Sequence, residues 1–242
     1  MGFKSALSNF FEKFLFNPKW KCVVCGREIF EDEYLCEHCK KEMPYNNGAI
    51  CGHCGRAVIA FEPYCTTCKN VLVALDLCRS CFVYAPPISN LVQRAKYENA
   101  RYLLDYFAQM LALEYAKNFF RADYLTCVPM TEKAYRDRGY NQSQILAEKL
   151  SERIGVPVLN CIKKVKDTKR QATLGRADRL KNLSDAFRVI DKSAVKDKSI
   201  MIIDDVSTTG ATAQVIAERL KTAGAKQVFL LTVASTPPLD KY

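Results

Sequence analysis

Histidine is almost absent from this sequence of 242 residues, which contains only His38 and His53. Both lie inside Cys-x-x-Cys motifs, so chemistry elsewhere in the chain must proceed without an imidazole as general base. The sequence also lacks the run of about 18 apolar residues that a membrane-spanning helix requires. These two absences exclude a histidine-based active site in the rest of the chain, and they exclude a transmembrane segment.

We do not expect a secretion signal either. The first residues, MGFKSALSNFFEKFLFN, place Phe3, Leu7, Phe10 and Phe14 at helical spacing, and no small-residue cleavage site is present. We expect residues 1–18 to form an amphipathic helix that docks on its own protein, with a membrane or a partner surface as the alternative. Twelve cysteines without a secretion signal indicate the reducing cytoplasm and metal binding rather than disulfides.

The bulk composition is that of a globular, basic protein. Apolar residues make up 49% of the chain, and the length is sufficient for two domains. The formal net charge of +10 favours anionic ligands. After the amino-terminal helix we expect a cysteine-rich domain over residues 19–73 and an α/β domain over residues 74–242.

The cysteine-rich segment is an internal repeat. CVVCGREIFEDEYLCEHCK and CGHCGRAVIAFEPYCTTCK align at all four cysteines, and Gly26 and Arg27 match Gly55 and Arg56. Each Cys-x-x-Cys-Gly turn points two thiolates at one ion, and two turns complete a tetrahedral zinc site. We predict one structural Zn²⁺ in each half, held by Cys22, Cys25, Cys36 and Cys39 in the first and by Cys51, Cys54, Cys65 and Cys68 in the second.

Two alternatives to this pairing are redox-active dithiols and an interleaved arrangement of the four turns. Four pairs in one register are difficult to explain as dithiols, and interleaving would lose the symmetry of the repeat. Since each site already has four sulfurs, the two histidines are expected to be spacers. Cysteines outside the repeat are predicted to be buried structural thiols: Cys78, Cys81, Cys127 and Cys161.

From about residue 74 the pattern alternates between strands and helices. Helical periodicity covers Ile88–Asn118, and a second helix, NQSQILAEKLSERIG, ends at Gly155. Strands are predicted in DYLTCVPM, VPVLNCIKKV, DAFRVI, SIMIIDD and KQVFLLTVA. Nearly continuous apolar runs such as Ile200–Ile203 are typical of a parallel sheet with helices on both faces. A ligand site is then expected at the carboxyl ends of these strands.

One strand is followed by two adjacent carboxylates, Asp204 and Asp205, and by the loop STTGAT at the start of a helix. Free N–H groups and the positive end of the helix dipole favour a phosphate monoester there. The acids are good acceptors for a vicinal diol, so the combination predicts a ribose 5-phosphate site. The loop residues expected to bind it are Ser207, Thr208, Thr209, Gly210, Ala211 and Thr212.

Positions Met201–Ala213 resemble the phosphoribosyl pyrophosphate signature of type I phosphoribosyltransferases. The segments LVQRAKY, YRDRGYNQSQILAEKL and VKDTKRQATLGRADRLKNLSDAF are similar to the ComF family, which includes competence protein ComFC and GntX-type relatives. This resemblance implies a double zinc ribbon followed by a type I phosphoribosyltransferase-like α/β domain with a parallel sheet. It also implies functional roles for Lys96 and Tyr97, whereas the pair Cys78 and Cys81 departs from the family pattern.

The resemblance further implies that phosphoribosyl pyrophosphate binds with Mg²⁺. Arg136 and Arg138 would contact the departing pyrophosphate, and Lys166–Asn182 would close as a lid that excludes water. Together with Asp204 and Asp205 these arginines are the candidate catalytic residues, acting by positioning and electrostatics rather than as nucleophiles. The alternative for the basic segment is a solvated surface.

The family link implies a role in DNA uptake during natural transformation. The activity expected is pentosyl transfer, and the alternative is a non-catalytic protein that binds single-stranded DNA and uses the nucleotide pocket for regulation. A third possibility is that the double ribbon binds a competence helicase or a second copy of the chain. The sequence identifies neither the acceptor nor the oligomeric state.

Overall fold

The computed structural model describes residues 21–30, 33–56, 58, 63–69, 74–166 and 185–236. The predicted amino-terminal helix and residues 167–182 of the predicted lid lie outside this set. The chain divides into two compact units, residues 1–43 and residues 44–242. The first four-cysteine repeat belongs to the first unit, and the second repeat belongs to the same unit as the α/β elements. The domain boundaries inferred from composition stay predictions.

The first unit is built from two cysteine turns and a short helix, α2 (Glu37–Lys41). Lys21 and Glu28 form an antiparallel bridge around the first turn. The N–H of Gly26 donates to the carbonyl of Cys22 at 2.8 Å, and Gly26 has a φ of +73°. Glycine adopts this left-handed conformation without a steric penalty, which explains its place after the second cysteine.

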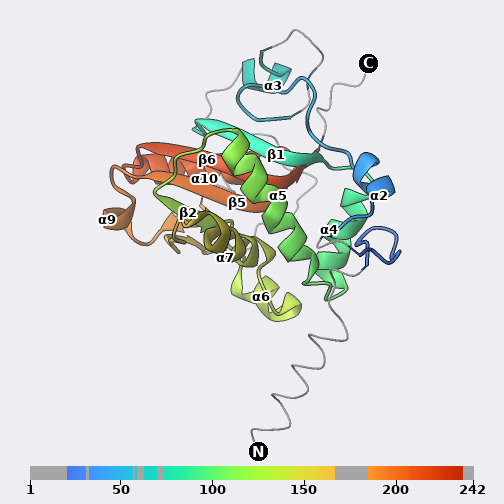
Figure 1. Ribbon diagram of the computed structural model, residues 1–242. Coiled ribbons are helices and arrows are strands. Elements are labelled where there is room, and N and C mark those ends of the chain that lie inside the picture. Colours follow the sequence, from blue (N-terminus) through green and yellow to red (C-terminus); the bar gives the residue numbers. More distant parts are fainter. Residues whose placement is uncertain are drawn as a thin grey trace, which may run out of the picture. The chain divides into compact units, whose positions relative to one another are not determined.

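The second unit contains a four-stranded parallel sheet with the strand order β1-β6-β5-β2 (Figure 1). Its strands are β1 (Leu77–Val83), β2 (Tyr124–Cys127), β5 (Ser199–Ser207) and β6 (Gln227–Ser235). Residues 199–203 of β5 are all buried, as are residues 228–235 of β6. The apolar runs therefore form the centre of a parallel sheet, as the sequence predicted.

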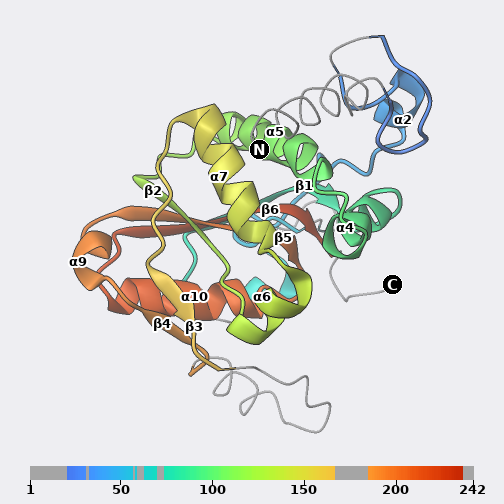
Figure 2. The ribbon, with the colours of Figure 1, turned by 90° about the horizontal axis from the view of Figure 1, so that it is seen from below.

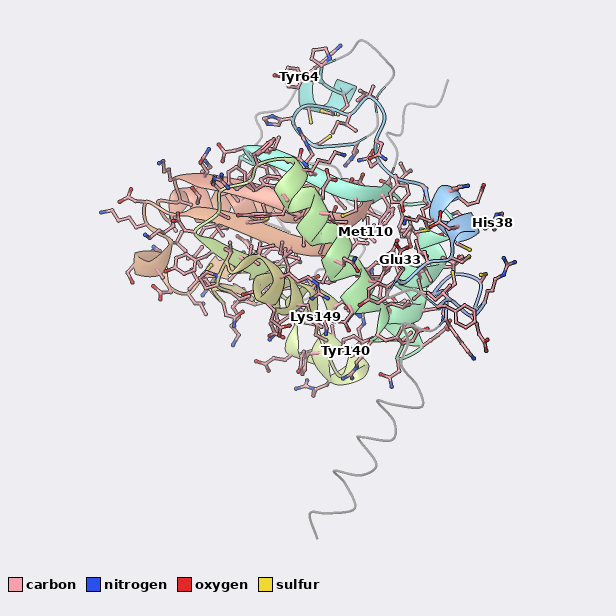
Figure 3. All side chains as sticks on the ribbon, in the orientation of Figure 1. Glu33, His38, Tyr64, Met110, Tyr140 and Lys149 are labelled. Atoms are coloured by element: carbon pink, nitrogen blue, oxygen red, sulfur yellow. The ribbon has the colours of Figure 1, made fainter. Side chains whose placement is uncertain are left out.

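Helices cover both faces of this sheet. α5 (Leu103–Lys117) and α7 (Gln142–Ile154) lie on one face, and α10 (Ala211–Thr222) lies on the other (Figure 2). The core beneath α10 includes Ile200, Ile202, Val228, Leu230, Ile216 and Leu220. On the opposite face Lys149 of α7, labelled in Figure 3, pairs with Asp105 of α5 at 2.8 Å. Among the described residues, no helix has the length and apolarity needed to cross a membrane.

The expected helix over residues 88–118 is in fact two helices, α4 (Ile88–Tyr97) and α5. The chain turns between them, where Asn99 has a φ of +54°. Asparagine tolerates this left-handed conformation better than most residues, so it can end a helix without interrupting the apolar periodicity.

The segments VPVLNCIKKV and DAFRVI do contain strands, but these lie outside the parallel sheet. β3 (Ile162–Lys164) and β4 (Phe187–Val189) pair antiparallel with each other in a separate two-stranded sheet. These strands carry charged residues, since Lys163 pairs with Arg188 and Lys164 pairs with Phe187, so they cannot be buried on two faces as the central strands are.

Three short helices complete the described structure: α3 (Thr66–Lys69), α6 (Glu132–Arg138) and α9 (Lys192–Val195). Arg136 and Arg138, predicted to contact pyrophosphate, thus lie on α6. The hydroxyl of Thr131 accepts from the N–H of Ala134 at the start of α6, and Gly139, with a φ of +81°, ends it. The cap residues of this helix were visible in the sequence, although its helical state was not predicted.

Candidate functional site

Two clusters of cysteines have the geometry of zinc sites. The sulfurs of Cys25 and Cys36 lie 3.8 Å apart, and those of Cys54 and Cys65 lie 3.7 Å apart. A tetrahedron of sulfurs about 2.3 Å from a zinc ion has edges of about 3.8 Å. The structure groups the cysteines within each half of the repeat rather than interleaving them, and all four sulfurs of each group lie within 4.8 Å of one another. This arrangement supports a four-cysteine Zn²⁺ site in each half.

The thiols of each cluster are electrostatically coupled. Burial acts to raise the pKa of Cys22 and Cys51, but hydrogen bonds from backbone N–H groups outweigh it and lower each pKa to about 7. Burial, followed by the negative charge on Cys51, raises the pKa of Cys54 to about 12. Thiolates this close repel one another, so a divalent cation is needed to stabilise four of them together.

The two adjacent acids lie near the carboxyl end of β5, where side chains from α7 and α4 reach them. The hydroxyl of Ser143 donates to Oδ1 of Asp204 at 2.8 Å, and the N–H of Asp205 donates to the same oxygen at 2.9 Å. Nζ of Lys96 lies 2.8 Å from Oδ2 of Asp205. The structure therefore joins Lys96, which the family resemblance had implied, directly to the acid pair.

Asp204 does not titrate like an ordinary aspartate. Burial, followed by the charge of the Asp205 carboxylate, raises the pKa of Asp204 to about 7, while the Ser143 hydroxyl and the Lys96 charge act in the opposite direction. Asp204 thus exchanges a proton near neutral pH. Its carboxyl group can accept hydrogen bonds from sugar hydroxyls when ionised.

The loop between β5 and α10 has the backbone geometry of an anion site. Gly210, with a φ of +74°, is the amino-terminal cap residue of α10 and provides no side-chain cap. The loop is held from the end of β6, because the N–H of Thr236 donates to the carbonyl of Ser207 at 3.0 Å and its hydroxyl donates to the carbonyl of Thr208 at 2.9 Å. Since Gly210 has no side chain to cap the helix, the first-turn amides beyond Ala211 can donate to a phosphate.

Within this loop the predicted binding residues differ in exposure. Thr208 and Thr209 are exposed, whereas Ser207, Gly210, Ala211 and Thr212 are half-buried. The hydroxyl of Thr209 accepts from the N–H of Ala211 at 3.3 Å. All six residues lie on the continuous segment from the last residue of β5 to the first turn of α10, which begins one residue after the acid pair.

The two arginines predicted to contact pyrophosphate differ in exposure and in position. Arg138 lines a cavity of about 450 Å³ together with Lys96, Tyr97 and Tyr140. Its guanidinium donates to Oε1 of Gln142 at 2.8 Å and lies 5.2 Å from the centre of the Tyr97 ring. Arg136 is exposed and does not line this cavity. The structure therefore groups Arg138, but not Arg136, with Lys96 and Tyr97.

Residues 141–143 were not predicted as site residues. The side chain of Asn141 accepts from the N–H of Ser143 at 3.1 Å and donates to the carbonyl of Val128 at 3.0 Å, which fixes the start of α7 beside the end of β2. Gln142 is buried, and its Nε2 has no acceptor among the described residues. The sequence did contain an indication of this arrangement, because Asn141 is a typical helix-capping residue and an apolar-periodic segment follows it. A helix that starts after Asn141 places Ser143 on the first turn of α7.

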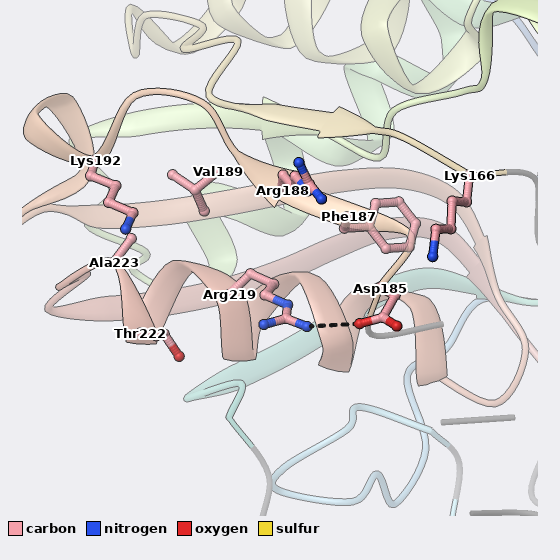
Figure 4. A pocket seen from close by; sticks show the side chains of 9 residues that line it. All are labelled: Lys166, Asp185, Phe187, Arg188, Val189, Lys192, Arg219, Thr222 and Ala223. Carbon is pink, nitrogen blue, oxygen red and sulfur yellow. Dashed lines mark ion pairs between the residues drawn. The ribbon is translucent and has the colours of Figure 1, made fainter. Parts of the chain in front are cut away.

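A second basic pocket lies elsewhere in the same unit, between the β3–β4 sheet and α10 (Figure 4). Its volume is about 520 Å³, and its basic lining residues are Lys166, Arg188, Lys192 and Arg219. Asp185 also lines it and approaches Arg219 at 4.0 Å. The pocket shares no lining residue with the Asp204 site, so it is a separate basic feature.

The cysteines outside the two clusters are buried free thiols, as predicted: Cys78, Cys81, Cys127 and Cys161. Burial raises the pKa of Cys127 to about 12. Such thiols stay protonated and act as small apolar side chains.

Comparison with known proteins assigns the same two parts. Residues 12–69 match the family model described as a double zinc ribbon domain, and residues 138–239 match a phosphoribosyl transferase domain. Among solved structures, the chain matches the glutamine phosphoribosylpyrophosphate amidotransferase from B. subtilis at 21% identity and a TM-score of 0.39. The similarity covers 54% of this chain and 26% of that one.

Several curated proteins match over most of their length. Competence protein F of Haemophilus influenzae is 30% identical over 220 residues, covering 86% of this chain and 94% of that protein. DNA utilization protein YhgH of Escherichia coli K12 is 28% identical over 218 residues, with 86% of each chain covered. Competence protein ComFC of Streptococcus pneumoniae is 26% identical over 226 residues, covering 86% of this chain and 96% of that protein. With its paired cysteine clusters and its parallel α/β sheet, the chain belongs to the ComF family.

Proposed function

We propose that this protein binds phosphoribosyl pyrophosphate together with Mg²⁺ and transfers its ribosyl group to an acceptor, in connection with DNA uptake. The observation that carries the proposal is the arrangement at the end of β5. Asp204 and Asp205, held by Ser143 and Lys96, precede a loop that leads into α10 through Gly210, a cap residue without a side chain.

Each part of the substrate has a matching group. The carboxylates of Asp204 and Asp205 accept hydrogen bonds from the ribose hydroxyls, and residues 207–212 bind the 5′-phosphate. The cavity lined by Lys96 and Arg138 lies on the Asp205 side and supplies positive charge for the pyrophosphate. Arg136 stands on the same helix, α6, and is proposed to assist once substrate is bound.

In the transfer step, the bond from the anomeric carbon to the pyrophosphate oxygen breaks and a bond to the acceptor nitrogen forms, while the proton of the acceptor nitrogen passes to the departing pyrophosphate. Lys96 and Arg138 stabilise the charge that develops on the departing pyrophosphate. Mg²⁺, when bound with the substrate, neutralises part of the same charge. The ionised carboxylates hold the ribose in position as its anomeric carbon becomes cationic.

Calorimetric titration of phosphoribosyl pyrophosphate with Mg²⁺ tests binding. We expect binding to the native protein and a loss of at least about 10-fold in affinity for the double variant Asp204→Asn, Asp205→Asn, because two charge-assisted hydrogen-bond acceptors are removed. Asp105→Asn, which removes a carboxylate from the Lys149 pair, is the matched control. Equal affinities in the native protein and the double variant would reject the acid pair as ribose ligands.

Transfer itself is tested by a screen of free nucleobases and amines for pyrophosphate release. We expect release with one acceptor class and none from the double variant. Release that persists in the double variant contradicts the proposed site. Binding without release from any acceptor supports the regulatory alternative, in which the nucleotide pocket serves a DNA-binding protein.

A second candidate function, direct binding of single-stranded DNA, is favoured by the basic pocket beside α10. Relatives carry the names competence protein F and DNA utilization protein, and the pocket places Arg188 and Lys192 on one open surface. We expect Arg188→Gln with Lys192→Gln to weaken binding of a single-stranded oligonucleotide. The slope of log affinity against log salt should fall by about 1.4, since about 0.7 is lost per phosphate contact. Lys196→Gln with Lys198→Gln, on the following exposed segment, is the control, and equal losses for both pairs would exclude a specific groove.

A further inference from the structure

The second zinc ribbon places an arginine against the phosphate loop. Nη2 of Arg56 lies 3.8 Å from the point where a Cβ atom on Gly210 would stand, and Oγ of Ser207 lies 3.8 Å from the same point. The guanidinium and the serine hydroxyl thus flank the one glycine of the loop. Arg56 belongs to the Cys-x-x-Cys-Gly-Arg turn of the second ribbon, which lies 154 residues before Gly210 in the sequence.

Within the described part of the chain, this buried guanidinium has no carboxylate partner. Arg56 is only 7% exposed, and no carboxylate among the described residues forms an ion pair with it. An arginine side chain remains charged at any pH that the protein tolerates, and a buried charge without a counter-charge is unfavourable. A buried cation that faces an anion-binding loop therefore points to an anionic ligand.

The internal repeat provides a comparison that separates this role from zinc binding. Arg27 occupies the matching place in the first ribbon, where the N–H of Cys22 donates to its carbonyl at 2.8 Å, just as the N–H of Cys51 donates to the carbonyl of Arg56 at 2.8 Å. Arg27 is nevertheless exposed. The turn around the thiolates therefore does not itself require a buried arginine, and the burial of Arg56 reflects its place at the loop.

The backbone that carries Arg56 is fixed on β1. The side chain of Asn46 donates to the carbonyl of Gly55 at 2.7 Å and to the hydroxyl of Ser80 at 2.9 Å. A Cβ on Gly55 would stand 2.4 Å from the carbonyl oxygen of Cys78, so the ribbon backbone packs directly on the strand. Rigid placement of this kind is what a preorganised anion site requires.

We infer that Arg56 is part of the phosphate subsite and that its guanidinium binds the 5′-phosphate monoester held by residues 207–212. The second ribbon then has a direct part in ligand binding, whereas the first ribbon does not share it. This inference deepens the proposed function and rests on it, because that function places a phosphate monoester in this loop.

The test is calorimetric titration of the zinc-loaded full chain with three probes: ribose 5-phosphate, phosphoribosyl pyrophosphate with Mg²⁺, and pyrophosphate with Mg²⁺. We expect Arg56→Gln to weaken the first two by roughly 10- to 100-fold, the effect of losing a hydrogen bond to a charged group. Pyrophosphate lacks the 5′-phosphate, so its affinity should be unchanged, which also verifies that the variant is folded. Arg56→Lys should retain part of the affinity, and Arg27→Gln should retain all of it.

The outcomes distinguish this inference from the proposed function. If phosphoribosyl pyrophosphate binds the native protein and Arg56→Gln equally well, the role of Arg56 is wrong and the proposed function stands. If only ribose 5-phosphate binds, in a manner that depends on Arg56, the phosphate subsite stands and the proposed substrate is wrong. The assignment of a local phosphate contact is overturned if Arg27→Gln weakens ribose 5-phosphate binding as much as Arg56→Gln does. It is also overturned if Arg56→Gln weakens pyrophosphate binding as much as it weakens ribose 5-phosphate binding.

Discussion

Lys96 and Asp205 form an ion pair at 2.8 Å that links α4 to the carboxyl end of β5. Both side chains are mostly buried, at 20% and 14% exposure. The lysine lies beside two carboxylates, Asp204 and Asp205, and lowers the pKa of Asp204 against the stronger effect of burial. It therefore favours ionisation of Asp204 beside Asp205, in a place where two negative charges alone would repel each other.

Replacing this lysine should destabilise the protein mainly at high pH. In Lys96→Met the acid pair loses its cation, and the repulsion grows as Asp204 ionises. We expect the Tm to fall by about 4 °C more at pH 8 than at pH 5.5, measured by thermal unfolding with zinc present. Lys149→Met is the control, because Lys149 pairs with Asp105 at the same distance of 2.8 Å. A loss for Lys96→Met that is equal at both pH values would show that the lysine does not act through the acid pair.

The raised pKa of Asp204 predicts a pH dependence of stability. In the folded protein this pKa is about 7, against an ordinary value of 3.8, so the native state retains a proton that the unfolded chain has already released. The free energy of unfolding should therefore fall as the pH rises from about 4 to about 7, by at most about 4 kcal/mol.

Asp204→Asn should remove most of this slope, because the amide does not titrate. Urea unfolding at a series of pH values measures it, and Asp105→Asn should keep the native slope. Should Asp204→Asn show the native slope unchanged, the pH dependence arises from other groups.

The parallel sheet was predictable because burial leaves a simple pattern. Ile200–Ile203 is apolar without interruption, and only a strand covered on both faces permits that. The break between α4 and α5 was not predictable in the same way. The apolar stripe continues from Ala95 to Leu103 across it, and the turn depends on the conformation of a single residue, Asn99.

The candidate site was predictable only where it is continuous in sequence. Asp204 and the loop after it lie on one segment, so adjacent acids and a glycine-containing turn identified them. Ser143 and Arg56 approach that segment from distant parts of the chain. A local sequence pattern cannot predict such tertiary contacts, so neither residue was identified. Arg27 and Arg56 occupy matching positions of the repeat, so the sequence alone does not predict that Arg27 is exposed and Arg56 is buried.

Zinc removal from the two ribbons should have unequal consequences. Cys22→Ser and Cys51→Ser alter matching positions, and each should lower the metal content from two zinc ions per chain to one, measured by elemental analysis. Loss of the second zinc ion should loosen the turn that carries Arg56, in which the backbone N–H of Cys51 donates to the carbonyl of Arg56, so Cys51→Ser should also weaken ribose 5-phosphate binding, by roughly 10-fold or more.

Cys22→Ser belongs to the other compact unit and should bind ribose 5-phosphate with native affinity. If each substitution removed both zinc ions, or if both weakened the phosphate ligand equally, the two ribbons would not be independent metal sites with separate roles.

A matched pair of glycines separates the packing of the second ribbon from its turn geometry. Gly26 and Gly55 have nearly the same φ, +73° and +67°, so alanine at either position costs about 1–2 kcal/mol in backbone strain. A Cβ on Gly26 meets nothing within 4 Å, whereas one on Gly55 would stand 2.4 Å from the carbonyl oxygen of Cys78 and 3.0 Å from Cα of Arg79.

We therefore expect Gly55→Ala to lower the Tm and to speed zinc loss to a chelator well beyond Gly26→Ala. Since the backbone of β1 cannot yield easily, the ribbon turn must shift, and Arg56 moves with it. Ribose 5-phosphate affinity should fall in Gly55→Ala and stay native in Gly26→Ala. Similar chelation rates for the two variants would mean that the second ribbon is not held on β1 through Gly55. Native phosphate affinity in a destabilised Gly55→Ala would instead show that the position of Arg56 is irrelevant to the ligand.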